Sequence, residues 1–197
     1  MEYHLQNRGF NKELLELLAP MYGENVVFFW LWNTMGQLAG YQQYRPNAPK
    51  EKRNEPRTGR YYTYRTPEHA YVIGGLETLH FSHEVFLVEG IFDAVQVWRQ
   101  GYACLFTCGT PSPVAADFVK NRLNRPVAAL LDPGLDKESL ADGRGSPSLK
   151  MFKKASHVQV RPEDYNVFTD LGDAESWQVE MLMMYGLQKL SQLNHKY

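Results

Sequence analysis

Three acidic residues in this 197-residue chain have positions that could bring their carboxylates together for chemistry. Glu89 follows the apolar run Glu84–Val88, Asp93 comes four residues later, and Asp132 follows a second apolar run, Val127–Leu131. Acids gathered at one edge of a sheet repel one another unless cations neutralise them, and hard carboxylate oxygens select Mg²⁺ or Mn²⁺. Two such metals stabilise the attacking and leaving oxygens of phosphoryl transfer, which serves nucleotide addition and phosphodiester hydrolysis alike.

A strand followed by a helix is expected to position the first two acids. Glu84–Val88 is rich in Val and Phe, and apolar residues between Ile91 and Trp98 recur at the spacing of one helix face. Gly90 at the junction can take the tight turn, so Glu89 lies at the carboxyl end of the strand and Asp93 in the first helical turn. An Asp in that turn also complements the helix dipole by about 0.3–1 kcal/mol, so a structural role is the alternative for Asp93.

Further strands and helices alternate after this unit. The predicted strands are Tyr102–Thr107, Val127–Leu131 and His157–Val160, and the predicted helices are Pro113–Leu123, Ser146–Ala155 and Ala174–Tyr185, with a short terminal helix or tail at Leu187–Tyr197. Strands that alternate with helices over short links pair in parallel through right-handed crossovers. The expected fold class is therefore α/β, with a parallel sheet flanked by helices and Asp132 at the same sheet edge as Glu89.

The N-terminal part has a different pattern. A short helix is predicted at Asn11–Ala19 with Asn11 as N-cap, then a β-hairpin of Val26–Trp32 and Gln37–Tyr44. The stretch Arg45–Arg65 that follows is rich in Lys and Arg, and Pro, Asn and Gly interrupt it, so we expect a basic loop. Such a loop is most often only solvated, but arginine interleaved with tyrosine also suits a nucleic-acid strand, through phosphate pairing and base stacking.

Composition limits the remaining classes. The net charge of −1 gives no global attraction to nucleic acid, so such a partner must meet a local basic patch. Cys104 and Cys108 are too few for a disulfide framework or a four-ligand zinc site and are expected to be buried free thiols. Because no apolar run reaches the roughly 18 residues of a membrane span and no signal peptide is evident, we expect a cytoplasmic protein without a membrane partner.

The segment LVEGIFDA, residues 87–94, resembles the first motif of the Toprim domain, which primases, type IA and type II topoisomerases and some nucleases share. The resemblance implies a Rossmann-like Toprim sheet. It also implies that Glu89 is a general acid/base or a metal ligand and that Asp93 helps to hold divalent metal. Cys108-Gly-Thr110 is similar to the small-residue turn after the second Toprim strand.

The second Toprim motif, Asp-x-Asp, is altered. The chain reads Asp132-Pro-Gly-Leu-Asp136, so Gly134 stands where the second acid is expected. Asp132 is implied as a catalytic and metal-binding residue, while Asp136 is either a displaced ligand or a polar turn residue. Two later acids, Asp170 and Asp173, occupy the place of the third acidic cluster of the family, and Asp173 could also be the N-cap of the helix that follows.

The region before the Toprim motif resembles the basic subdomain of the primase polymerase core. The hairpin, the basic stretch, RYYTYR, TPE and GGL occur in the same order as that subdomain's elements. The resemblance implies a small mixed α+β basic subdomain at residues 1–80 and a Toprim domain with a C-terminal helix at 81–197. Its phosphate-contacting residues would be Arg45, Lys50, Arg57 and Arg60.

The function that this resemblance implies is a primase-like nucleotidyltransferase, which makes RNA primers on single-stranded DNA from nucleoside triphosphates with Mg²⁺ or Mn²⁺. No four-cysteine zinc module and no GxxxxGK[ST] loop occur, so a separate helicase or template-recognition protein is expected. That build resembles a phage replication protein working in the host cytoplasm. The alternatives are a Toprim nuclease that cuts DNA or RNA, and a noncatalytic nucleic-acid-binding replication subunit.

Overall fold

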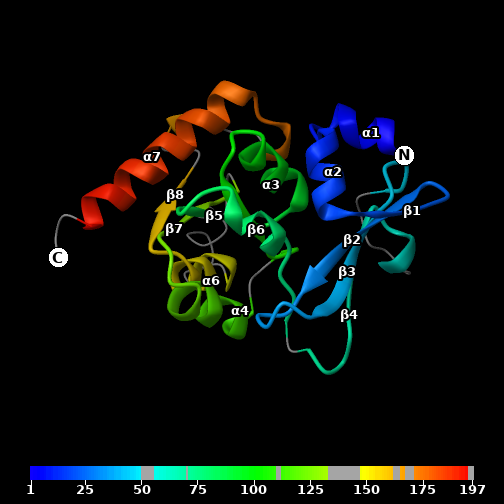
Figure 1. The fold of residues 1–197 in the computed structure, drawn as a ribbon, viewed down its shortest axis with the longest axis horizontal. Helices are drawn as coiled ribbons and strands as arrows, with labels where there is room; N and C mark the ends of the chain where they lie inside the picture. Colours follow the sequence, from blue (N-terminus) through cyan, green and yellow to red (C-terminus); the bar gives the residue numbers. More distant parts are fainter. Residues whose placement is uncertain are drawn as a thin grey trace.

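Two sheets of different kinds organise the computed structural model, which describes residues 1–49, 56–69, 71–109, 112–132, 147–161, 165–166 and 171–194 (Figure 1). Within these ranges, one sheet is antiparallel in the order β1-β2-β3-β4, and the other is parallel in the order β6-β5-β7-β8. The parallel sheet confirms the predicted α/β class.

The antiparallel sheet contains the predicted hairpin. Its strands are β1 (Met21–Gly23), β2 (Val26–Trp32), β3 (Leu38–Tyr44) and β4 (Tyr61–Arg65). Gly36 has a φ of +74° in the β2–β3 turn, a conformation that glycine takes without strain. The expectation of a loop through Arg65 was wrong for β4, because three tyrosines and a threonine favour a strand and β3 offers an edge with which to pair. The short 3₁₀ helix η1 (Pro56–Thr58) precedes β4.

Two helices precede this sheet. Helix α2 (Lys12–Leu18) has the predicted N-cap, since the Asn11 side chain accepts a hydrogen bond from the Leu14 N–H at 2.9 Å. Helix α1 (Glu2–Asn7) was not predicted, because only Leu5 among its residues is buried and it has no capping side chain. Both helices pack beside β2 and against the rest of the molecule through apolar residues.

The parallel sheet follows the predicted order of elements. These are β5 (Val85–Val88), α3 (Ile91–Trp98), β6 (Ala103–Phe106), α4 (Pro113–Asp117), β7 (Val127–Leu130), α6 (Pro147–Ala155) and β8 (Val158–Val160). Helix α4 continues as a π-helical turn, η3 (Phe118–Arg122). Figure 1 shows α4 and α6 on one face of the sheet and α3 and α7 on the other.

Helix α7 (Ser176–Asn194) is longer than predicted. It follows the 3₁₀ turn η5 (Leu171–Asp173) and runs through Gly186, where the sequence suggested an end. A Cβ at Gly186 would lie 3.2 Å from the Ala128 Cβ, so the helix lies close against the sheet there. Packing on β7 and β8 thus maintains the helix across a residue of low helix propensity.

A short segment joins the two sheets. Ile73 forms an antiparallel bridge with Trp32, and Gly74 forms one with Phe106. A Cβ at Gly74 would lie 2.0 Å from the Phe106 ring, so only glycine allows this approach. The 3₁₀ helix η2 (Leu76–His80) follows directly. The domain boundary predicted after residue 80 therefore comes just beyond a segment that hydrogen-bonds to both sheets, and it stays a prediction.

The apolar core follows the same organisation. Phe86 and Val88 of β5 point to the layer of α3 and α7, whereas Val85 and Leu87 point to the layer of α4 and α6. The first layer is continuous with Leu5, Phe10 and the inner face of β2, so residues from both halves of the chain share one core. No helix in the described part of the chain is long and apolar enough to span a membrane.

Candidate active site

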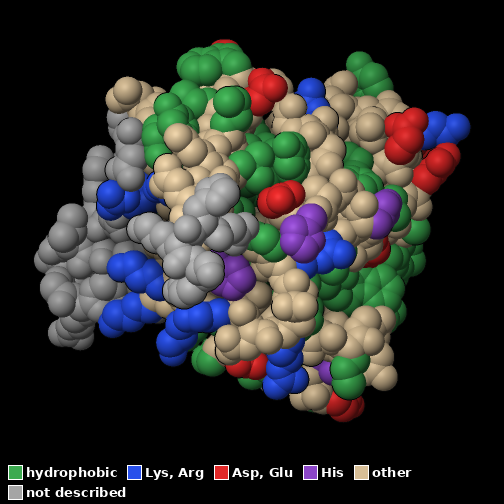
Figure 2. All heavy atoms as spheres, turned by 60° about the vertical axis from the view of Figure 1, so that its left-hand side comes forward, with side chains coloured by type: hydrophobic (Ala, Val, Ile, Leu, Met, Phe, Trp, Pro, Cys, Tyr) green, Lys and Arg blue, Asp and Glu red, His purple; other side chains and the backbone are tan. Residues whose placement is uncertain are grey.

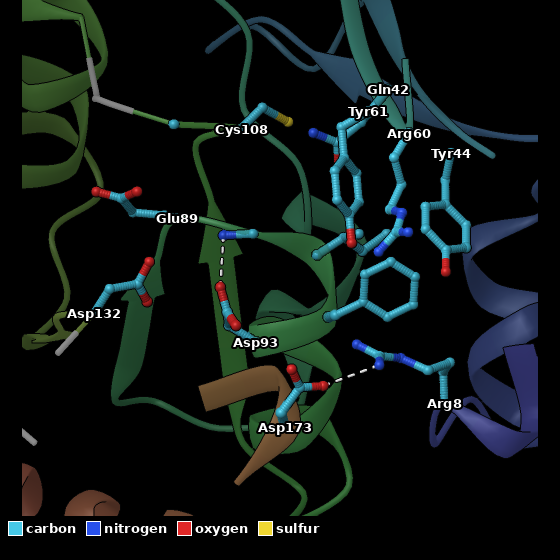
Figure 3. A pocket seen from close by; sticks show the side chains of 14 residues that line it. Arg8, Gln42, Tyr44, Arg60, Tyr61, Glu89, Asp93, Cys108, Asp132 and Asp173 are labelled. Carbon is cyan, nitrogen blue, oxygen red and sulfur yellow. Dashed lines mark hydrogen bonds and ion pairs between the residues drawn. The ribbon is translucent and has the colours of Figure 1, made fainter. Parts of the chain in front are cut away.

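A cavity of about 460 Å³ lies at the carboxyl edge of the parallel sheet, where it meets the antiparallel sheet (Figure 3). Its two sides differ in chemistry. The side from the parallel-sheet half carries the acids Glu89, Asp93, Asp132 and Asp173. The side from the N-terminal half carries Arg8, Gln42, Tyr44, Arg60 and Tyr61. A ligand in this cavity would thus contact carboxylates on one side and guanidinium and aromatic groups on the other.

Glu89 and Asp132 occupy the expected positions at neighbouring strand ends. Glu89 directly follows β5, and Asp132 follows β7 after one further residue. The two strands are adjacent and parallel, so their carboxyl ends meet. Figure 3 shows both side chains on the same side of the cavity, across from the arginines.

Asp93 lies deeper and already has hydrogen-bonding partners. Its Oδ2 accepts the Gly90 N–H at 2.9 Å, which caps α3, and its Oδ1 accepts the Gly172 N–H at 2.9 Å. The side chain therefore ties η5 to the first turn of α3. The structural alternative for Asp93 is present, and its role toward metal stays a prediction.

Asp173 pairs with Arg8, a residue that no sequence pattern indicated. Its Oδ1 lies 3.0 Å from Nη1 of Arg8, and the Arg8 guanidinium lies over the Phe92 ring at 4.6 Å from its centroid. The alternative of Asp173 as a helix N-cap was wrong, because α7 begins at Ser176 and Asp173 ends η5. Because a short connection separates η5 from α7, the Asp173 carboxylate does not cap the helix and instead lines the cavity.

The aromatic side of the cavity is a packed cluster. The Tyr44 ring lies 4.7 Å from the Phe92 ring and 5.3 Å from the Tyr61 ring, and the Tyr44 hydroxyl lies 3.0 Å from His4 Nε2. Burial raises the pKa of Tyr44 above its ordinary value, so the phenol stays protonated at neutral pH. Arg60 is oriented beside the cluster because its Nε donates to the Ala48 carbonyl at 3.0 Å.

A thiol completes the lining without offering a reactive thiolate. Burial raises the pKa of Cys108 to about 12, more than a hydrogen bond from Thr63 lowers it. Cys104 is fully buried in β6, and burial raises its pKa well above the ordinary value. Both cysteines are free thiols, as predicted, although Cys108 is only partly buried.

The remaining predicted residues do not all reach this cavity. Arg57 is exposed, and its carbonyl accepts a hydrogen bond from the Gln43 side chain, while Arg45 is half-buried. Neither is among the described residues that line the cavity. Lys50, Asp136 and Asp170, and also Gly134, lie outside the described residues.

The oxygen donors of the cavity are of a type that suits a divalent cation. Four of the described residues that line it carry carboxylates, and oxygen donors of this kind fit Mg²⁺ or Mn²⁺. Among the described residues, however, no three His, Cys, Asp or Glu side chains are close enough to one another to hold a metal ion. The fit to a metal is therefore one of ligand type, and Mg²⁺ commonly keeps several waters when it has few protein ligands.

Arg8 and Tyr44 were not predicted, and Tyr61 was expected only as one of the aromatic residues interleaved with arginine in the basic stretch. The two tyrosines carried a signal, since they pair across β3 and β4 and so lie on one face of the sheet. Arg8 carried none, because its partners Phe92 and Asp173 are far from it in the sequence.

No family model matches the sequence, and no curated protein matches it. Solved structures do match. The Escherichia coli primase catalytic core has a TM-score of 0.55 at 14% identity, over 81% of this chain and 64% of that chain. The RNA polymerase domain of Mycobacterium tuberculosis primase DnaG, in complex with a DNA duplex that has a 6-nucleotide overhang, has a TM-score of 0.53 at 16% identity, over 93% and 63%. A DnaG primase catalytic domain bound to single-stranded DNA has a TM-score of 0.51 at 15% identity, over 92% and 61%.

These comparisons establish the fold. Over the part of those structures that it covers, the chain has the fold of DnaG primase catalytic cores, which is the fold that the resemblance to the primase polymerase core implied. The chain spans less than two thirds of the length of the structures it matches.

Proposed function

We propose that this protein is a primase-like nucleotidyltransferase that makes RNA primers on single-stranded DNA. The observation that carries the proposal is the two-sided cavity, with acids on the sheet edge facing arginines and tyrosines, in a chain with a primase-core fold. A nucleoside triphosphate needs both sides, because its phosphates pair with guanidinium groups and its metal ions with carboxylates.

The acidic side would hold the metal. Glu89 and Asp132 are the central ligands, and Asp93, Asp136, Asp170 and Asp173 are the further candidates. Bound Mg²⁺ or Mn²⁺ would lower the charge on the reacting phosphate and stabilise the leaving oxygen. Glu89, directly after β5, is also the residue that we assign as general acid/base.

The opposite side would hold the nucleotide. Arg60 and Arg8 supply guanidinium groups, and Tyr44, Tyr61 and Phe92 supply an apolar surface for a base or a sugar. In this structure the Arg8 guanidinium forms an ion pair with Asp173. A triphosphate carries more negative charge than one carboxylate and would therefore attract the guanidinium more strongly. We infer that the incoming phosphate replaces Asp173 as the partner of Arg8 and so frees Asp173 to turn toward the cation.

Template contacts would come from the basic segment outside the cavity, with Arg45, Lys50 and Arg57. Two of the matching primase structures were solved with bound DNA, which supports single-stranded DNA as the partner. A separate helicase or template-recognition protein, an origin in a phage and a place in the host cytoplasm belong to the same proposal.

The deciding experiment is a primer-synthesis assay. The protein is incubated with single-stranded template, ribonucleotides and either Mg²⁺ or Mn²⁺, and the labelled products are separated by size. We expect new oligonucleotides. Cut template would instead identify a nuclease, and binding without either product would identify a noncatalytic subunit.

Glu89→Gln is the variant to run beside the wild type. It removes a charge without changing volume, so we expect product formation to fall by about 10²–10⁴-fold while DNA binding and the unfolding temperature hold. Glu180→Gln, the same change at an exposed site on α7, is the matched control and should keep full activity. Unchanged turnover in Glu89→Gln would remove Glu89 from the mechanism.

A further inference from the structure

A second cavity, of about 650 Å³, lies away from the acidic site. We call it the lysine groove, and it is lined among others by Lys120, Asn121, Lys153, His157, Leu190 and Leu193. No Asp or Glu is among the described residues that line it. Figure 2 shows Lys and Arg side chains gathered on the lower left of the face that it draws, with a histidine beside them. For a chain of net charge −1, this is a strong local excess of positive charge.

The groove lies at the opposite end of the parallel sheet from the acids. Pro126 and His157, which line it, immediately precede β7 and β8, so the groove marks the amino ends of these strands. Glu89 and Asp132 mark the carboxyl ends. A four-residue strand such as β7 is about 13 Å long, so the two sites are separated by roughly that length of sheet.

The cations are presented by elements that are firmly packed. Phe152 and Ala155 of α6 are fully buried, which fixes the helix so that Lys153 and Lys154 face solvent. Lys120 and Asn121 lie on the π-helical turn η3, a widened turn of the kind that often occurs at functional sites. Lys120 and Lys153 are both exposed and can reach a ligand without any change in the fold.

Neutral surfaces lie beside the two lysines. Leu193, near the end of α7, is 37% exposed and supplies an apolar surface, and the buried Leu190 lies at the wall beside it. The exposed imidazole of His157 is oriented because its Nδ1 accepts the Val127 N–H at 3.3 Å. The guanidinium of Arg125 is committed to the carbonyls of Leu79 and Ser82, so it supports the wall of the groove rather than a ligand.

We propose that the lysine groove binds single-stranded nucleic acid, with phosphates on Lys120 and Lys153 and a base against His157 and the two leucines. Cations beside flat or apolar surfaces are the combination that single-stranded nucleic acid needs, because each nucleotide brings one phosphate and one stacking face. An acidic peptide would use the lysines but not the stacking surface. The choice of a nucleic acid rests on the proposed function, whereas the groove and its charge do not.

A strand held in the groove must pass around the edge of the sheet to reach the acidic cavity. Only an oligonucleotide long enough to cover that distance can occupy both sites. The groove therefore adds affinity for long strands and none for strands that fill the cavity alone.

The test compares short and long oligothymidylates, of about 6 and about 30 nucleotides, by fluorescence anisotropy over a range of salt concentrations. The test variant is Lys120→Gln/Lys153→Gln. Each phosphate contact with a single strand changes the slope of log affinity against log salt by about 0.7, or about five-fold in affinity at 0.1 M salt. We expect the double variant to bind the long strand about 25-fold more weakly, with a slope smaller by about 1.4, and to lose less affinity for the short strand, which can occupy the acidic cavity without the groove.

Single variants supply the matched control. Lys153→Gln should show about half of the slope change of the double variant, and Lys12→Gln, the same substitution on exposed α2, should leave the slope unchanged. Equal effects of the two single variants, or an unchanged slope in the double variant, would show that the groove does not contact the strand. Polyglutamate of matched charge as a competitor separates the two polymers, since displacement of DNA at equal concentration would identify a general polyanion site and overturn the proposal.

The primer-synthesis assay separates this inference from the proposed function. Loss of long-strand binding in the double variant of a protein that makes no primers would leave the groove established and the primase proposal refuted. Primer synthesis by the wild type, together with unaltered long-strand binding in the double variant, would support the primase proposal and refute the role of the groove.

Discussion

The four carboxylates that the described residues bring to the cavity reach it from different elements. Asp93, on α3, accepts two backbone N–H groups, and Asp173, at the end of η5, pairs with the guanidinium of Arg8. Glu89 and Asp132 come from the ends of the neighbouring strands β5 and β7. Residue type alone therefore does not decide what each acid can do, because Asp93 and Asp173 also hold elements together.

Metal binding should reveal this difference. We expect Asp132→Asn to weaken Mn²⁺ binding by about 10–100-fold and Asp136→Asn to weaken it less, because Asp132 directly faces the cavity. With Gly134 in place of an acid, few ligands remain, so activity should need millimolar Mg²⁺ or prefer Mn²⁺. Calorimetric titration of both metals into both variants gives the comparison. An equal loss in Asp136→Asn would identify it as the displaced second ligand.

A half-buried acid outside the cavity, Glu77, should make stability depend on pH. Burial raises the pKa of Glu77 above its ordinary value, more than the hydrogen bond from Trp32 Nε1 lowers it, and its Oε2 has no hydrogen-bond partner among the described residues. The folded state thus keeps this proton to a higher pH than the unfolded state. The contribution of Glu77 to stability is complete below the unfolded pKa and is lost as pH rises through the folded pKa.

Glu77→Gln is neutral throughout this range and should become more stable than the wild type as pH rises above the ordinary carboxyl pKa. Urea unfolding at about pH 4 and about pH 8 measures the difference. In a Trp32→Phe background the carboxylate loses its donor, so the advantage of glutamine at the higher pH should grow. A difference that does not vary with pH would mean that Glu77 titrates alike in both states.

At the scale of elements, Asp93 connects α3 to η5, and through η5 it sets where Asp173 lies. We expect Asp93→Ala to cost about 2–4 kcal/mol of unfolding free energy, since it removes a helix cap and leaves the Gly172 N–H without its acceptor. Asp93→Asn keeps one acceptor oxygen and should cost less. Asp117→Ala, at an exposed pair with Arg122, should stay within about 0.5 kcal/mol. Denaturant melts of the three variants rank them, and a cost for Asp93→Ala no larger than that for Asp117→Ala would refute the connection.

Local pattern predicted the elements that bury a regular stripe. Strands β5 to β8 and helix α3 came from apolar runs and spacing, and the β2–β3 hairpin from its turn. Helix α1 and strands β1 and β4 were missed, because their short segments are stabilised by neighbours rather than by their own pattern. The predicted helix ended before Gly186, because the low helix propensity of glycine was considered without the sheet against which α7 packs there.

At the scale of the whole molecule, only one of the two sides of the site was predictable from the sequence. The acidic side could be placed from the sequence, because parallel strand ends share one edge. The side with Arg8 and the tyrosines depends on how the N-terminal half docks, and the sequence contains no local signal for that docking. The bridge from Gly74 to Phe106 is one of the contacts that fix it.

Gly74→Ala should therefore disturb the whole molecule. The new methyl would lie 2.0 Å from the Phe106 ring, which is buried, so we expect a loss of at least about 1–3 kcal/mol. Gly101→Ala, in open space at a φ of +80°, should cost only about 1–2 kcal/mol of backbone strain. Adding Phe106→Leu should recover part of the loss in Gly74→Ala and none in Gly101→Ala.

Thermal melts followed by circular dichroism and by tryptophan fluorescence would measure these costs. Coincident transitions would show one cooperative unit, as the shared core suggests. Two separate transitions would show that the boundary predicted near residue 80 divides two folding units.

The ion pair between Arg8 and Asp173 has a consequence for the order of events during folding. Its partners are 165 residues apart, and the Phe10–Phe92 ring contact nearby also joins segments that are distant in the sequence. Contacts between such distant segments form slowly, since a long loop must close before they can contribute. In a refolding experiment, the parallel sheet should therefore regain its circular dichroism before nucleotide binding returns, and a nascent chain should have no complete cavity until η5 has been synthesised.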